Sequence, residues 1–245
     1  MRDERRPSLA RLTLVELRKA TDTRAGFWLQ LSVLALGVLV MLISALTGHA
    51  GDHSLRQLFS DTSQAINALL PVVGILLVSS EWSQRTAQIT FTLVPRRGRV
   101  VAAKVGAALL IALAAFVVSL LLALLGTAIA SPGLPGTWSL PAGQIGQVAL
   151  YLAVNMVIGV SFGALLLSSA PAIVSYFLVP IGIAALGTIN AIQDVFRWFD
   201  QSSMQHITER LLSGNEWART GTSLAFWMLL PLAIGTWRIL RSEIN

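Results

Sequence analysis

Few side chains in this chain have the types and the spacing that chemistry requires. His49, Asp52 and His53 have a spacing that suits a metal ion if the segment is helical, but two histidines in a polar loop are more often solvated. We therefore expect no metal site. The sequence contains no Gly-x-Ser-x-Gly turn and no Gly-x-x-x-x-Gly-Lys-Ser/Thr loop, and it contains no cysteine. These observations predict a chain that is not an enzyme and holds no cofactor of its own.

Two asparagines lie inside long apolar runs. Asn67 and Asn155 either line a substrate path or hydrogen-bond neighbouring helices. Gly159 and Gly163 form a pair of small residues four apart, which permits close helix approach within one subunit or between two. We expect no ionisable side chain deep in the apolar runs, where an ion-coupled carrier needs one.

The elements that must position these residues are six apolar runs. The chain is 54% hydrophobic and 12% charged with a mean hydropathy of +0.69, which predicts an all-α polytopic membrane protein. Its 245 residues form one domain with six spans between residues 27 and 240. The spans are expected at about residues 27–46, 58–80, 100–130, 144–167, 172–189 and 220–240.

Three features accompany the spans. Residues 1–26 predict a cytoplasmic amphipathic helix, with Arg11, Arg18 and Asp22 on one side. The third run would measure ~46 Å as one helix, and Lys104 is expected to snorkel to its cytoplasmic end. Residues 190–219 mix charges with apolar residues at steps of three and four, which predicts external interfacial helices.

The distribution of Lys and Arg predicts the orientation. Seven lie up to residue 24, five between residues 85 and 104, and two at Arg238 and Arg241, all on one side of the six spans. Four lie on the other side, and the acidic residues divide evenly. The positive-inside rule then places both termini in the cytoplasm, and the basic balance signals topology rather than nucleic-acid binding.

The most informative polar stretch follows the second span. It runs Ser80-Glu81-Trp82-Ser83-Gln84-Arg85-Thr86 and continues to Pro95-Arg96-Arg97-Gly98-Arg99. Topology control alone would explain Arg96, Arg97, Arg99 and Lys104, which can hold a loop at an anionic leaflet. It does not explain an acid at the membrane exit with polar side chains beside it.

These residues, together with the Glu16-Leu17-Arg18-Lys19 helix, resemble the membrane subunits of type-2 ATP-binding cassette exporters, six-span permeases common in actinobacteria. The resemblance covers essentially the whole chain. It implies that the N-terminal helix and residues 81–99 dock on a separate ATPase subunit. The implied coupling residues are Glu81, Trp82, Ser83, Gln84, Arg85, Thr86, Arg96, Arg97 and Arg99, and the implied residues of the N-terminal interface are Glu16, Arg18, Lys19 and Arg24. The family often has Gly where this chain has Arg85.

The same resemblance implies the mechanism. Six spans make half a transporter, so two copies, or this chain and a homologue, pair around a two-fold axis. ATP and Mg²⁺ belong to the partner subunit, whose closure would drive an amphipathic or lipid-like cargo outward across the bacterial plasma membrane. Membrane lipid is the remaining partner, and no nucleic acid is expected.

Two alternatives from other classes stay open. One is a non-transporting membrane partner, an immunity or sensor subunit that uses the same fold. The other is an intramembrane enzyme, which would need His and acidic residues clustered in adjacent spans, whereas His49, His53 and His206 all lie outside the spans.

Overall fold

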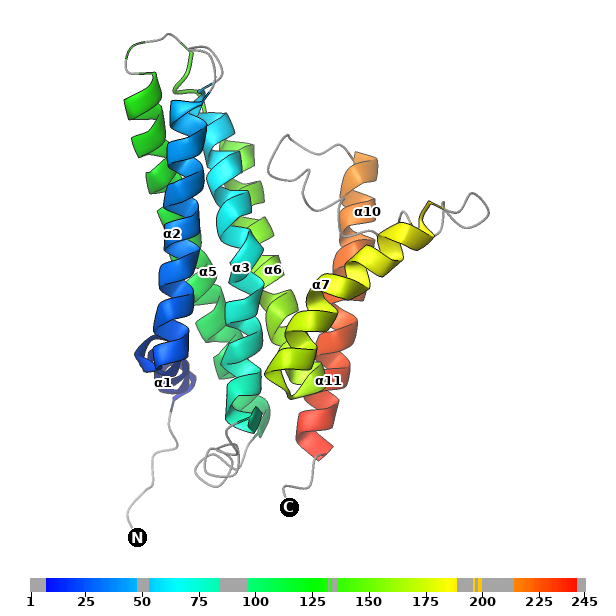
Figure 1. Cartoon of the computed structure of the whole chain (residues 1–245). Helices are drawn as coiled ribbons and strands as arrows, with labels where there is room; N and C mark the ends of the chain where they lie inside the picture. The colour runs from blue at the N-terminus through cyan, green and yellow to red at the C-terminus, as the bar shows by residue number, and fades with distance from the viewer. Residues whose placement is uncertain are drawn as a thin grey trace.

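The prediction of an all-α membrane protein is confirmed. The computed structural model describes residues 8–47, 53–83, 97–131, 133, 136–188, 196, 198–199 and 214–241, and no strand occurs among them. Six helices are long and apolar enough to cross a membrane. The described chain is a bundle in which α1 lies at the same end as the last residues of α11 (Figure 1). We call this end the terminal end, and the other the opposite end.

The first two helices meet at a sharp corner. α1 covers Leu9–Asp22, and its N-cap Ser8 accepts a hydrogen bond from the backbone of Arg11. Thr23 is extended, so it ends α1 and caps α2 (Arg24–Leu46) by accepting from the backbone of Gly26. α1 therefore lies across the terminal end of the bundle (Figure 1).

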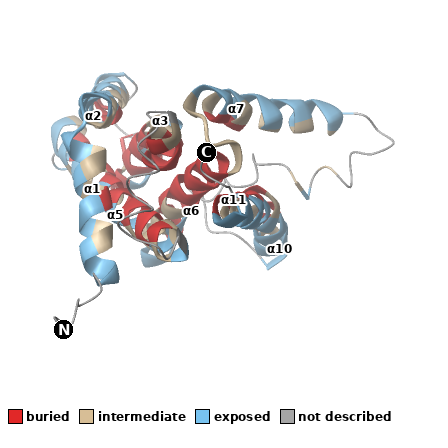
Figure 2. Ribbon diagram, turned by 90° about the horizontal axis from the view of Figure 1, so that it is seen from below, coloured by how far each residue is buried: buried red, intermediate tan, exposed pale blue. Residues whose placement is uncertain are grey.

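The core is built around two central helices. α3 (Leu55–Ser83) and α6 (Ala142–Leu166) are mostly buried, as Figure 2 shows, and they make the most extensive helix contact in the chain. α2 and α5 (Arg97–Ala130) pack beside α3 and leave an apolar outer face. The third apolar run is thus a single helix, as predicted, and it starts three residues before Val100.

The seam between α3 and α6 is closest near the terminal end. A Cβ atom on Gly163 would lie 2.7 Å from the Ile75 carbonyl oxygen, and one on Gly159 would overlap the Pro71 carbonyl. Gly74 of α3 lies equally close to the backbone of α6. The small-residue pair therefore packs against α3 within the chain.

The last two spans pack on α6 from its other side. α7 (Ser169–Leu186) buries only Ala172 and Tyr176, and its second half leans away from the bundle (Figures 1 and 2). The final span consists of α10 (Gly214–Leu224), a π-helical turn η2 (Ala225–Leu229) and α11 (Leu230–Arg241). This helix includes the span expected from about Thr220 and is described from Gly214 onward. Most of the predicted interfacial segment 190–219 lies outside the described residues.

Candidate functional site

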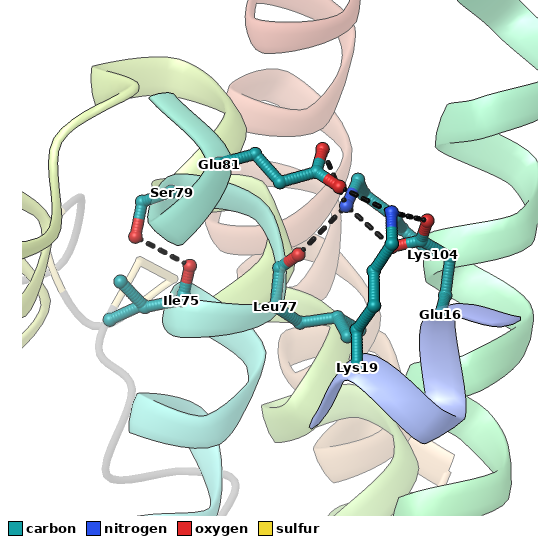
Figure 3. A network of polar contacts seen from close by, with 7 residues as sticks. All are labelled: Glu16, Lys19, Ile75, Leu77, Ser79, Glu81 and Lys104. Carbon is teal, nitrogen blue, oxygen red and sulfur yellow. Dashed lines mark hydrogen bonds and ion pairs between the residues drawn. The ribbon is translucent and has the colours of Figure 1, made fainter. Parts of the chain in front are cut away.

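Four charged side chains meet at the terminal end of the bundle (Figure 3). Glu16 and Lys19 come from α1, Glu81 from the last turn of α3, and Lys104 from about two turns inside α5. The Lys104 Nζ atom lies 2.6 Å from Glu16 Oε2 and 3.1 Å from Glu81 Oε2. The Lys19 Nζ atom lies 2.9 Å from Glu16 Oε1 and 2.7 Å from Glu81 Oε1. We call these four residues the ionic network.

The ionic network is closed and neutral. Each carboxylate contacts both ammonium groups, and Lys104 also donates to the Leu77 carbonyl oxygen at 3.0 Å, which occupies all three of its donors. The Glu16 and Lys104 side chains are each only 6% exposed. Desolvated charges are tolerated when they are fully paired, and removing one partner leaves a buried charge without compensation. The network therefore locks α1 to α3 and α5.

Lys19 is the accessible member, with 41% of its side chain exposed. Burial alone would lower the pKa of Lys19, but the hydrogen bonds and charges of Glu81 and Glu16 outweigh that effect and raise the pKa above its ordinary value of 10.5. The Lys19 ammonium is therefore retained throughout the neutral range, and its contribution to stability is lost only as the pH rises through this raised pKa.

The structure corrects one expectation. Lys104 does not snorkel to the membrane surface: it points into the bundle, because two carboxylates and a carbonyl group surround it there. Asp61 also lies within a spanning helix, near the start of α3. Asp61 accepts hydrogen bonds from Ser44 of α2 at 3.0 Å and from Gln57 at 2.9 Å. The signal for Lys104 was available, because a lysine within an apolar run needs a buried partner.

The other predicted coupling residues are placed only in part. Trp82 is partly buried against the core beside Glu81, and Arg99 is partly exposed near the start of α5. Ser83 ends α3 and Arg97 begins α5. The rest of the coupling set, Gln84, Arg85, Thr86 and Arg96, lies outside the described residues.

α1 presents two different faces. Glu16 is buried, with Leu12, Leu17 and Ala20 partly covered beside it. Arg11, Arg18 and Asp22 are exposed on the outward face, together with Leu14 and Val15, and Arg24 is exposed at the start of α2. The residues predicted for the N-terminal interface therefore divide: Glu16 and Lys19 enter the ionic network, whereas Arg18 and Arg24 face outward.

Both asparagines make hydrogen bonds between helices. The Asn67 side-chain amide donates to the Tyr151 hydroxyl at 2.8 Å, which joins α3 to α6. Asn155 donates to the Tyr151 carbonyl at 2.9 Å and accepts from the Tyr176 hydroxyl of α7 at 3.5 Å. Asn155 is 2% exposed. This geometry favours the packing interpretation over a substrate path.

Of the three residues with a metal-compatible spacing, only His53 lies in the described part of the chain. His53 is buried, while His49 and Asp52 lie outside the described residues. Within the described ranges, no three His, Cys, Asp or Glu side chains come close enough to share a metal ion.

Comparisons with known proteins yield no assignment: no protein-family model matches the chain, and a search of curated proteins finds no match.

Proposed function

We propose that this chain is the membrane-spanning subunit of a type-2 ATP-binding cassette exporter, driven by a separate ATPase subunit. The observation that carries the proposal is the ionic network. It ties α1 to the end of α3 and the start of α5, which are the two helices that flank residues 84–96. A force applied to α1 or to that connection would reach both helices together.

The physical reason is the stiffness of a buried, fully paired charge cluster. Separating Lys104 from Glu16 would cost each of them its closest partner, and Val78, Val100 and Val160 line the apolar crevice beside Lys104. α1 therefore moves with α3 and α5 rather than sliding over them. A lever needs this property, whereas a helix that only rests on the membrane surface does not.

The remaining parts of the proposal follow from the sequence. The Lys and Arg distribution supports a cytoplasmic terminal end, where an ATPase that holds ATP and Mg²⁺ would dock on the outward face of α1. A second copy or a homologue completes the transporter. We propose an amphipathic or lipid-like cargo, as the sequence analysis expects.

The test is purification of the chain in mild detergent from its own organism, followed by reconstitution with any nucleotide-binding subunit that accompanies it. We expect cargo-stimulated ATP hydrolysis that falls at least tenfold in Glu81→Gln, while the amount of assembled complex stays within about twofold. Asp61→Asn is the matched control, since it makes the same change at the opposite end of α3. It should keep wild-type coupling.

Two results would overturn the proposal. One is transport by the isolated chain with no ATPase subunit present. The other is full coupling of ATP hydrolysis in both Glu81→Gln and Lys19→Gln. Lys19→Gln changes the accessible member of the network, so it should fold even if Glu81→Gln does not. A complex that hydrolyses ATP on a signal but moves no cargo would instead identify the immunity or sensor alternative.

A further inference from the structure

One face of α3 stays partly uncovered. α2 and α7 flank α3 on one side of the bundle (Figure 2), but α7 touches α3 near the terminal end, where the Ser79 and Ser169 hydroxyl oxygens lie 2.9 Å apart. The second half of α7 leans away from it (Figure 1). In the half of α3 that this leaves open, a row of partly or fully exposed positions recurs at steps of three and four residues, which places them on one side of the helix. We call this row the α3 strip; it consists of Gln57, Asp61, Gln64, Ala65, Ala68 and Val72.

Tryptophans give the depth of the α3 strip in the bilayer. On the last span, the exposed Trp217 and Trp237 are about 20 residues apart, or about 30 Å along a helix, which matches the thickness of the hydrocarbon layer. Trp82 lies near the level of Trp237, because the ends of α3 and α11 line the same crevice there. Counted back from Trp82, Gln64 and Ala68 are about 27 Å and 21 Å along α3. Both therefore lie within the hydrocarbon layer.

Gln64 carries hydrogen-bonding groups that lipid cannot satisfy. Its Nε2 atom donates to the Ser60 Oγ atom at 3.1 Å, and its carbonyl oxygen accepts no hydrogen bond from the described residues. An unpaired amide group in hydrocarbon is costly, so a helix face that carries one is normally turned toward protein. The outward face of α5 is different, since its exposed positions from residue 109 to 129 are all apolar. Lipid can cover that face of α5 but leaves the α3 strip incomplete.

The amide group of Gln64 is complementary to itself, because it both donates and accepts hydrogen bonds. Around a two-fold axis along the membrane normal, two copies of α3 bring each residue of the strip opposite its own copy. Two Gln64 side chains can then exchange hydrogen bonds. Ala65 and Ala68, one turn farther into the bilayer, are small enough for the two helices to approach closely. Asp61 lies nearer the aqueous phase and is engaged by the Ser44 hydroxyl of α2 at 3.0 Å, which weakens its repulsion of the second copy.

We propose that the α3 strip is the surface through which two identical copies of this chain associate. The two α3 helices cross near Ala68, and the Gln64 amides pair beside the crossing. Self-complementarity selects a second copy over a different partner, because a different partner would have no reason to carry the same amide at the same depth. The description of this pair as the two halves of a transporter rests on the proposed function, but the association itself does not.

The chain contains no cysteine, so single cysteines report the contact directly. Ala68→Cys is introduced into full-length chains that carry two different tags, and their native membranes are treated with copper phenanthroline. Leu113→Cys is the matched control on the 56% exposed Leu113. It lies at about the depth of Ala68, because the Thr62 hydroxyl of α3 donates to the Ser119 carbonyl of α5 at 3.1 Å. We expect about tenfold more disulfide-linked dimer from Ala68→Cys, since a disulfide needs Cα atoms within about 7 Å.

A second change tests the amide group. In the Ala68→Cys chain, Gln64→Leu keeps the approximate size of the side chain but removes its donor and acceptor. The linked dimer should fall about threefold to tenfold, the effect of one hydrogen bond between helices in a membrane. Gln64→Asn retains an amide and should keep most of the dimer. Gln64 is partly exposed, so both variants should reach the membrane in the same amount as the parent chain, which the tags measure.

Three results would overturn this inference. Equal cross-linking of Ala68→Cys and Leu113→Cys would show random collision. A link from Ala68→Cys to a different polypeptide would assign the α3 strip to another protein. Undiminished cross-linking in Gln64→Leu would show that the amide plays no part.

The experiment is also separable from the proposed function, because no ATPase or cargo enters it. A linked dimer in a chain that does not transport would refute the proposed function alone. Transport by a complex in which Ala68→Cys does not link would refute the α3 strip alone.

Discussion

The contact between α3 and α6 is made by backbone near one end and by side chains toward the other. Near the terminal end, Gly159 and Gly163 bring the two backbones into contact, and the ionic network closes the same end through α1 and α5. Toward the opposite end, the helices are joined by side chains, with Asn67 donating to Tyr151. The helices α7 and α10 stand apart there (Figure 1).

This difference separates a rigid half from an adjustable one. Backbone contact and buried paired charges have few alternative arrangements of similar energy, so they transmit displacement. Single neutral hydrogen bonds contribute only about 1 kcal/mol each and can be exchanged for others. Backbone contact and the ionic network therefore hold the terminal end of this seam more firmly than the Asn67–Tyr151 hydrogen bond holds the part beyond it.

The largest expected effect comes from Lys104→Met. It leaves Glu16 and Glu81 close together with only the half-exposed Lys19 beside them. We expect the free energy of unfolding, measured by SDS-induced unfolding in mixed micelles, to fall by about 3 to 5 kcal/mol. Combining it with Glu16→Gln should recover part of that loss. If the single variant proved as stable as the parent chain, the terminal end would not be held by charge.

A smaller loss is expected from Gly159→Ala. The new Cβ atom would overlap the Pro71 carbonyl, so α3 and α6 must separate. The expected loss of unfolding free energy is about 1 to 3 kcal/mol. Gly146→Ala is the matched control on the same helix, because nothing lies within 4 Å of its added Cβ. Equal effects of the two variants would contradict the close backbone packing.

The opposite half should respond more weakly to Tyr151→Phe. This variant removes the acceptor of the Asn67 amide and should cost about 1 kcal/mol by the same unfolding measurement. Tyr176→Phe removes only a 3.5 Å contact to Asn155 and should change the unfolding free energy by less. A loss in Tyr151→Phe as large as that in Lys104→Met would erase the distinction between the two halves.

The smallest effect is expected at Lys19. Since its side chain is 41% exposed, Lys19→Met should cost no more than about 1 kcal/mol. Its raised pKa fixes the pH dependence: the difference from the parent chain should be constant from pH 6 to about pH 10 and should shrink at higher pH, as Lys19 loses its proton. Unfolding titrations at several pH values check this, and a difference that vanished below pH 8 would contradict it.

Several features could be predicted because they are local. The rise of an α-helix and the hydropathy of a run of about 20 residues suffice to place a span, so α5 was expected as one helix. The N-terminal helix was expected with Arg11, Arg18 and Asp22 outward, and they are exposed. Glu81 was singled out by its charge at a membrane exit, and it lies in the ionic network.

Other features could not be predicted because they depend on residues far away in the chain. Lys104 was expected to snorkel, but its partner Glu16 lies 88 positions earlier in the chain, and no local pattern indicates that pairing. The contacts of Arg219 with Trp198 and of Trp227 with Phe199 likewise join residues that are far apart in the sequence. A hydropathy profile contains no information about contacts between residues so far apart.

The amino-acid sequence by itself determined that this chain is a helical membrane protein and how many helices are long and apolar enough to cross a bilayer, since both depend on neighbours within a few turns. Only the tertiary structure decided which charges pair, which glycines touch backbone and which face of α10 is buried. Those outcomes depend on the relative placement of helices, and the free energies that set it arise between residues tens of positions apart.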